Sequence, residues 1–249
     1  MKKIKILKII ILLLFVCSLF SFVGIAKDFS NNEITDNSNL NNDDEIDFSS
    51  FRYVALGDSI TYGYSSITKD KATNGGYPQL VKNTLGLKDV INYGVCGAQT
   101  SSMINNIDKM YDNADIVSFM GGTNDCYQSC PIGTIDDIGV DTFYGRMKLL
   151  AVKLKAKYPN SFLFFMTPYK SKADSCYIGN QNGNTLKDYA NVIIEICNIY
   201  NIPVLDMYNY GQFELEMFKD YSDGTHPSEY FYENYSAPQI SNFIKENYK

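Results

Sequence analysis

The stretch that decides the fold is Tyr53–Thr61, which has the sequence Tyr-Val-Ala-Leu-Gly-Asp-Ser-Ile-Thr. Its first four residues are apolar or aromatic, which is typical of a buried β-strand, and the Gly-Asp-Ser that follows predicts a sharp turn. A turn at that place lifts the hydroxyl of Ser59 clear of the carboxyl edge of the sheet. Open α/β sheets bind their ligands at this edge.

Strands and helices are predicted to alternate along the rest of the chain. Four further apolar runs predict strands, at residues 89–93, 115–120, 161–166 and 203–207. Apolar residues recur at helical spacing in five segments, at residues 77–86, 103–111, 143–158, 184–200 and from 228 onward. Asn184 and Ser228 are expected to cap the last two helices, and Pro238 to split the final one. This order predicts a three-layer α/β/α, flavodoxin-like fold with a five-stranded parallel sheet.

The first 26 residues have the features of a signal peptide. Four lysines lie within the first eight residues, an apolar run follows from Ile9 to Val23, and Gly24-Ile25-Ala26 supplies the small residues that a signal peptidase needs. The alternative is an uncleaved membrane anchor, for which the run is close to the lower limit of about 17 residues. We expect cleavage after Ala26 and a secreted, extracellular protein with no transmembrane segment left.

Residues 27–50 are rich in Asn, Asp, Ser and Glu and predict a disordered linker. Residues 51–249 are then a single domain, long enough to form a full hydrophobic core. The net charge is −6 and the isoelectric point is about 4.8. Because no basic stripe appears, nucleic acid is excluded as an expected partner.

Five cysteines remain after the leader, an odd number that requires at least one free thiol or an intermolecular bond. Cys126 pairs with Cys130 in one arrangement, and Cys130 pairs with Cys176 in another; the sequence leaves both open. The spacing lacks the second pair of ligands that a zinc site needs, so we expect no metal and no cofactor.

The chain contains one histidine, His226, and it follows Asp223 by three residues. A serine on a strand-end turn, a histidine and a nearby aspartate supply a nucleophile, a general base and a group that orients the base. These three residue types predict a serine esterase.

Four blocks in the same order resemble the SGNH (GDSL-type) hydrolase superfamily over nearly all of residues 51–249. They are Gly57-Asp58-Ser59, the glycine at 97, the asparagine within Gly121-Gly122-Thr123-Asn124-Asp125, and Asp223-Gly224-Thr225-His226-Pro227. Each motif alone is weak, but four in order at strand ends are specific. One departure is Cys96, where the family commonly has serine.

The resemblance implies an SGNH-hydrolase fold and a set of roles. Ser59 would be the nucleophile, His226 the base and Asp223 its partner. The backbone N–H groups of Ser59 and Gly97 and the side-chain amide of Asn124 would form the oxyanion hole.

Each of these residues also has an ordinary structural explanation. Ser59 could simply cap the next helix, Gly97 could serve only a positive φ, and Asn124 could belong to a turn. Asp223-Gly224 could form a type I′ hairpin turn, with His226 as an ordinary surface residue beside it. The absence of a Gly-x-Ser-x-Gly elbow argues against an α/β-hydrolase. Two non-catalytic alternatives are a flavodoxin-like flavin-binding protein and a carbohydrate-binding surface module.

The expected substrate is a small ester or an acylated polysaccharide. An exported acidic protein with tyrosines in its loops suits removal of short, acetyl-type O-acyl groups from carbohydrate, because tyrosine rings stack on sugars. The reaction would pass through an acyl-serine intermediate. The alternative within the family is a GDSL-type lipase or thioesterase that acts on lipid or small acyl esters.

Overall fold

The computed structural model describes residues 46–209 and 223–249. The predicted signal peptide and most of the predicted linker lie outside the described residues and stay predictions. The compact unit begins at Ile46 rather than at the expected Phe51. The reason is Phe48, whose buried ring packs against those of Phe51 and Tyr248 at centroid distances of 5.3 and 5.8 Å.

The predicted five-stranded parallel sheet is confirmed. Its strands are β1 (Arg52–Gly57), β4 (Asp89–Gly94), β5 (Ile116–Met120), β6 (Phe162–Met166) and β7 (Val204–Leu205). They pair in the order β4-β1-β5-β6-β7, and every pair is parallel. Gly57 lies level with Gly94 on one side and with Met120 on the other, so three strands end side by side.

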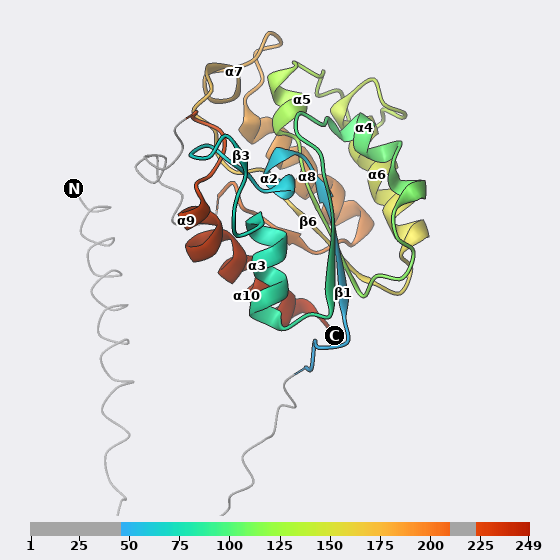
Figure 1. The fold of residues 1–249 in the computed structure, drawn as a ribbon. Helices are drawn as coiled ribbons and strands as arrows, with labels where there is room; N and C mark the ends of the chain where they lie inside the picture. Colours follow the sequence, from blue (N-terminus) through green and yellow to red (C-terminus); the bar gives the residue numbers. More distant parts are fainter. Residues whose placement is uncertain (1–45, 210–222) are drawn as a thin grey trace, which may run out of the picture. The chain divides into compact units, whose positions relative to one another are not determined.

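Helices cover both faces of this sheet, as Figure 1 shows. One face carries α3 (Gly76–Leu85), α9 (Glu229–Phe231), the π-helix η3 (Tyr232–Ser236) and α10 (Ala237–Asn247). The other carries α4 (Thr100–Ile104), the 3₁₀-helix η1 (Ile107–Lys109), α6 (Phe143–Lys157) and α8 (Leu186–Tyr200).

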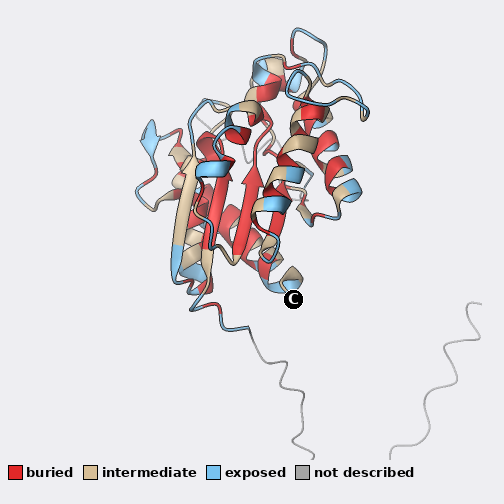
Figure 2. Ribbon diagram, turned by 90° about the vertical axis from the view of Figure 1, so that its right-hand side faces the viewer, coloured by how far each residue is buried: buried red, intermediate tan, exposed pale blue. Residues whose placement is uncertain are grey.

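The strands alternate between the two cores. Tyr53 and Ala55 belong to the core beneath α3 and α10, whereas Val54 and Leu56 belong to the core beneath α6 and α8. Both faces are therefore apolar, which explains the continuous hydrophobic runs in the sequence. The central strands are almost entirely buried in Figure 2, and the exposed residues lie on the outer sides of the helices, in the loops and in the β2–β3 hairpin.

Three helix predictions need correction. The segment 103–111 is not one helix but α4 followed by η1, since the amide of Asn106 bonds the Ser102 carbonyl at 3.0 Å and competes with the helical pattern. Thr185 rather than Asn184 caps α8, in a capping box with Asp188. Pro238 does not split the last helix; the chain stays helical and widens into η3 just before it, which accommodates the missing N–H.

Short elements lie beyond the strand ends, outside the segments predicted as strands or helices. They are α2 (Ser59–Tyr62), the hairpin of β2 (Tyr64–Ser65) and β3 (Asp70–Lys71), α5 (Thr123–Tyr127) and α7 (Asp174–Tyr177). Among residues 46–209 and 223–249, no helix is both long and apolar enough to cross a membrane.

Candidate active site

The turn after β1 presents Ser59 at the start of α2. Asp58 is the N-cap of this helix, and its Oδ1 accepts the backbone N–H of Ile60 at 2.9 Å. Ser59 is therefore not the cap, which removes its simplest structural explanation. Gly94 lets the turn pack closely on β4, because a Cβ at position 94 would lie 2.0 Å from the backbone nitrogen of Tyr62.

Ser59 and His226 come together although 167 residues separate them. The Oγ of Ser59 lies 2.8 Å from Nε2 of His226, and Nδ1 of the same ring lies 2.7 Å from Oδ2 of Asp223. An ionised carboxylate only accepts, so the proton is on Nδ1 and Nε2 is left to accept from the serine hydroxyl. The three predicted residues thus form a continuous hydrogen-bonded chain.

The turn that holds His226 is built around the Asp223 carboxylate. Its Oδ1 accepts the backbone N–H groups of Thr225 and His226 at 2.9 and 2.8 Å, while its Oδ2 faces the ring. Burial alone would raise the pKa of Asp223, but these hydrogen bonds outweigh it and lower the pKa below its ordinary value. Asp223 therefore stays ionised at neutral pH.

The ring of Tyr64 on β2 lies against the His226 ring, with centroids 4.5 Å apart. The unexpected β2–β3 hairpin therefore borders the site directly. Tyr64 is one of the tyrosines that the sequence places in a loop of the substrate site, but the hairpin itself is not predicted, because a two-residue strand is too short to show a period.

The expected oxyanion-hole residues lie on the two loops that flank the serine turn. Gly97, on the loop between β4 and α4, has a φ of +75° that disfavours other residues. Asn124 is the second residue of α5, after β5, and its amide donates to the Ala98 carbonyl at 3.1 Å. Within the described part of the chain, the backbone N–H groups of Ser59 and Gly97 have no acceptor and are free to bind an anion.

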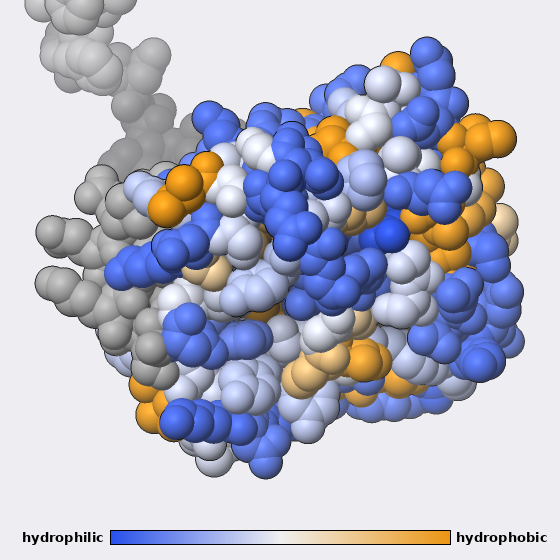
Figure 3. Space-filling model, turned by 90° about the horizontal axis from the view of Figure 1, so that it is seen from above, coloured by the Kyte–Doolittle hydropathy of each residue, from blue (hydrophilic) through white to orange (hydrophobic). Residues whose placement is uncertain are grey.

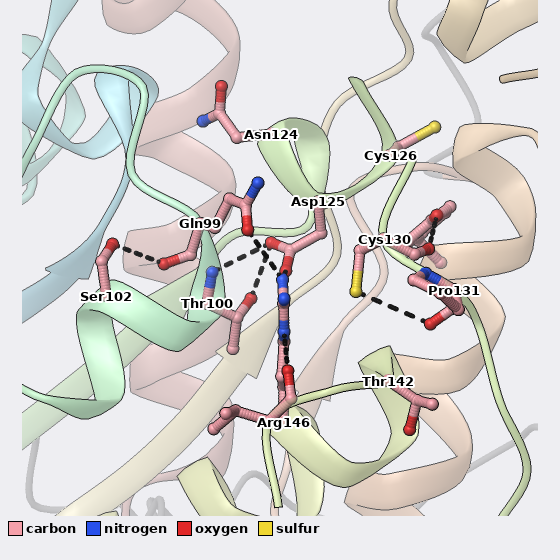
Figure 4. A network of polar contacts seen from close by, with 12 residues as sticks. Gln99, Thr100, Ser102, Asn124, Asp125, Cys126, Cys130, Pro131, Thr142 and Arg146 are labelled. Atoms are coloured by element: carbon pink, nitrogen blue, oxygen red, sulfur yellow. Dashed lines mark hydrogen bonds and ion pairs between the residues drawn. The ribbon is translucent and has the colours of Figure 1, made fainter. Parts of the chain in front are cut away.

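A buried ion pair beside these loops escaped the sequence analysis. Asp125, directly after Asn124, lies 2.7 Å from the guanidinium of Arg146 on α6. Figure 4 shows this pair and the side chains around it. The one available signal was composition, since Arg146 is one of only two arginines in the chain.

The five cysteines of the described residues are free thiols, so neither of the two pairings considered above is present. Instead, the thiol of Cys126 on α5 donates to the Ser175 carbonyl at 3.6 Å, and its interaction with the thiol of Cys176 on α7 raises the pKa of Cys126 and lowers that of Cys176. Cys96 is exposed beside Gly97, in the turn where the family commonly has serine.

A cavity of about 530 Å³ adjoins the Gly97 loop. It is lined by residues from the ends of β1 and β4, the loop after β4, α4 and the segment beyond it: Leu56, Gly57, Asn92–Ala98, Ser102, Met103, Asn106 and Lys109. Figure 3 looks onto the carboxyl edge of the sheet; hydrophilic residues cover most of its described surface, and hydrophobic residues form separate patches. In residues 46–209 and 223–249, no cluster of His, Cys, Asp or Glu is arranged to hold a metal ion.

The chain is similar to one family of known proteins. The model of the GDSL-like lipase/acylhydrolase family matches residues 55–233. No curated protein matches the chain.

Several solved structures have the same fold. A protein from Lactobacillus plantarum is 24% identical, with a TM-score of 0.72 over 80% of this chain and 99% of its own. A possible lipase from Chitinophaga pinensis is 24% identical, with a TM-score of 0.67 over 79% and 98%. A lipase/acylhydrolase from Enterococcus faecalis is 23% identical, with a TM-score of 0.61 over 80% and 97%.

Proposed function

The chain belongs to the GDSL-like lipase/acylhydrolase family, which makes it an ester hydrolase, and on that premise we propose that it is a serine esterase using Ser59, His226 and Asp223. The observation that carries the proposal is the pair of contacts on one imidazole, 2.8 Å to the serine hydroxyl and 2.7 Å to the carboxylate. A hydroxyl is a weak nucleophile until a neighbouring base accepts its proton, and this arrangement provides that base.

In the proposed reaction, Oγ of Ser59 attacks the ester carbonyl while Nε2 of His226 takes the hydroxyl proton. The carbon–oxygen bond to the alcohol then breaks, and His226 returns the proton to the departing alcohol. An acyl-serine remains, and a water molecule activated by the same histidine releases the acid. Asp223 keeps the ring in the required tautomer and stabilises its protonated form.

The oxyanion formed by this attack needs donors already in place. The unoccupied backbone N–H groups of Ser59 and Gly97 support their role as these donors. The side-chain amide of Asn124 donates one hydrogen to the Ala98 carbonyl and has a second one for the oxyanion. Loss of one such donor typically lowers kcat by about 10²–10³.

For the substrate, the proposal is a short-chain, acetyl-type O-ester on carbohydrate. Tyr64, whose ring lies against that of His226, supports this proposal because an aromatic side chain beside the site can stack on a sugar ring. The largely hydrophilic surface at this edge suits a polar polymer better than a lipid aggregate.

One observation favours a second candidate, an acylhydrolase for longer acyl chains. The cavity beside Gly97 has a volume of about 530 Å³, which is far more than an acetyl group occupies, and apolar side chains such as Leu56 and Met103 contribute to its lining. An acyl chain directed past Gly97 would remove this apolar surface from water.

Export is also part of the proposal. The lysine-rich start, the apolar run and the small residues before Lys27 support secretion, with retention as an N-terminal anchor as the alternative. N-terminal sequencing of the protein recovered outside the cells tests it, since cleavage leaves Lys27 as the first residue.

The test of activity compares p-nitrophenyl acetate with p-nitrophenyl octanoate, using the wild type, Ser59→Ala and Ser161→Ala. Ser161 is a matched control because it lies before β6, at the opposite edge of the sheet, where its hydroxyl donates to the Ala114 carbonyl. We expect Ser59→Ala to lose about 10⁴-fold or more in kcat and Ser161→Ala to retain activity. Undiminished hydrolysis by Ser59→Ala would refute the proposed nucleophile.

The same assay separates the two substrate classes. Faster turnover of acetate than of octanoate, with acetate release from acetylated xylan, pectin or peptidoglycan, supports the carbohydrate esterase. A preference for octanoate with no release from the polymers favours the longer-chain acylhydrolase.

A further inference from the structure

The two loops that carry Gly97 and Asn124 are joined by one buried carboxylate. Oδ2 of Asp125 accepts both the backbone N–H and the hydroxyl of Thr100, at 3.0 and 2.9 Å. Asp125 and Thr100 are completely buried. Because Thr100 follows Gly97 by three residues and Asp125 follows Asn124 directly, this carboxylate fixes the spacing between the two loops.

Arg146 holds the other side of the same carboxylate. One guanidinium nitrogen lies 2.7 Å from Oδ1 of Asp125 and 2.9 Å from the side-chain oxygen of Gln99, and Nε donates to the Val140 carbonyl at 2.7 Å. In Figure 4 the guanidinium points from α6 toward Asp125, with Gln99 and Thr100 beside it. Arg146 therefore ties both loops to a helix of fifteen residues.

Neither loop is held firmly by its own secondary structure. Asn124 belongs to α5, which has five residues, and Gly97 precedes α4, which also has five. Helices this short have little stability of their own, so contacts made elsewhere in the fold must hold their positions. The planar guanidinium suits this task, because it donates several hydrogen bonds in fixed directions.

The charge of Arg146 matters as much as its geometry. A carboxylate one residue from Asn124 would, if unbalanced, repel the negative charge that develops on the substrate oxygen. The guanidinium compensates that charge, and their contact is shielded from water because Asp125 is buried.

We infer that Asp125 and Arg146 are positioning residues that hold Gly97 and Asn124 in the geometry of the oxyanion hole. This inference rests on the proposed esterase function. Neither residue touches the reacting atoms; Asp125 sets the distance between the loops, and Arg146 anchors Asp125 and offsets its charge.

Arg146→Met tests the inference, with Lys153→Met as the matched control. Lys153 lies on the same helix, and its Nζ forms an ion pair with Oδ2 of Asp108 on η1 at 3.0 Å, but that pair is exposed. Displaced donors lower turnover more than substrate binding, so we expect Arg146→Met to lower kcat for p-nitrophenyl acetate about 10- to 100-fold and to change KM by less than about threefold. Lys153→Met should match the wild type.

A double-mutant cycle with Asn124→Ala distinguishes positioning from general loss of structure. If Arg146 acts through Asn124, replacing Arg146 lowers kcat much less once the Asn124 amide has been removed. The kcat of the double variant is then well above the value expected from multiplying the fold losses of the two single variants. Equal loss of kcat in both backgrounds, or a kcat for folded Arg146→Met within about twofold of the wild type, overturns the inference.

A milder variant covers the case in which Arg146→Met does not fold. Thr100→Val removes only the hydroxyl donor to Asp125 and keeps the backbone bond, so a loss of about three- to tenfold in kcat is expected, non-additive with Asn124→Ala. Arg146→Lys should be more active than Arg146→Met, because lysine restores the positive charge although it lacks the planar set of guanidinium donors. Unchanged kcat in Thr100→Val, together with no recovery in Arg146→Lys, also overturns it.

The outcomes for the two proposals are distinguishable. A wild type that hydrolyses no ester, or an active Ser59→Ala, refutes the proposed function. An active wild type that depends on Ser59 but not on Arg146 refutes only the positioning role.

Discussion

Asp58 lies next to the proposed nucleophile and is buried on all sides. Burial raises its pKa to about 7, although the hydrogen bond from Ile60 acts in the opposite direction. The carboxyl of an unfolded chain has a pKa of about 3.9, so between these values the folded protein binds more protons than the unfolded one. At acidic pH the buried carboxyl of Asp58 is protonated and does not oppose folding. As the pH rises toward 7, keeping it buried lowers the free energy of unfolding.

We predict that Asp58→Asn becomes more stable relative to the wild type as the pH is raised from 5 to 8. Asparagine keeps the cap acceptor for Ile60 but cannot ionise, so the relative gain is on the order of 1–4 kcal/mol. Urea unfolding at both pH values measures it. Asp136→Asn, at an exposed position, serves as the control, and an identical pH trend in both variants would contradict the prediction.

The thiols should differ sharply in reactivity. Cys96 is exposed, whereas Cys126, Cys130, Cys176 and Cys197 are buried, and burial raises the pKa of Cys197 to about 12. Thiolate is the reactive form, and it must also be reached by the reagent. We predict that an aromatic disulfide reagent labels Cys96 first in the native protein and the other four only after unfolding.

Peptide mapping of the labelled protein identifies the sites. Cys96→Ser should abolish the fast labelling of the native protein and leave the slow labelling of the four buried cysteines unchanged. Rapid labelling of any of the buried four in the native state would show that the fold opens more readily than its packing indicates.

At the scale of elements, α6 joins the core to the network that holds the site. Leu150, fully buried on its inner face, and Val152, about half exposed on its outer face, form a matched pair. We predict that Leu150→Ala lowers the free energy of unfolding by about 2–5 kcal/mol, because it leaves a cavity. Val152→Ala should change it by about 0.5 kcal/mol or less. Chemical denaturation measures both, and equal effects would contradict the assignment of the inner face.

The main elements could be predicted from the sequence because their signals are long and local. Each strand of the sheet is an apolar run ended by glycine, proline or a polar turn, and each long helix has one apolar face. The β2–β3 hairpin could not be found, since two-residue strands have no measurable period. The N-cap of α8 is Thr185, one residue after the predicted Asn184. Both residue types cap helices well, and Thr185 is favoured because its backbone N–H and its hydroxyl donate to the Asp188 carboxylate.

At the scale of the whole molecule, the serine and the expected oxyanion-hole residues could be predicted because they follow strand ends directly, whereas His226 could be predicted because it is the only histidine in the sequence. Ser59, Gly97 and Asn124 come just after β1, β4 and β5, and neighbouring parallel strands must end at one edge. Arg146 could not be placed in the same way. It lies inside a helix, and its contact with Asp125 depends on how α6 packs against the sheet, which no local pattern specifies.

The separation of Ser59 from His226 has a consequence for the timing of activity. All five strands of the sheet precede the histidine, so a growing polypeptide can assemble its sheet before the imidazole leaves the ribosome. On the proposed mechanism, a nascent chain carries a serine without its base and is inert. Newly made protein thus becomes an esterase only once the turn that carries Asp223 and His226 has joined the part already folded, long after the nucleophile itself was synthesised.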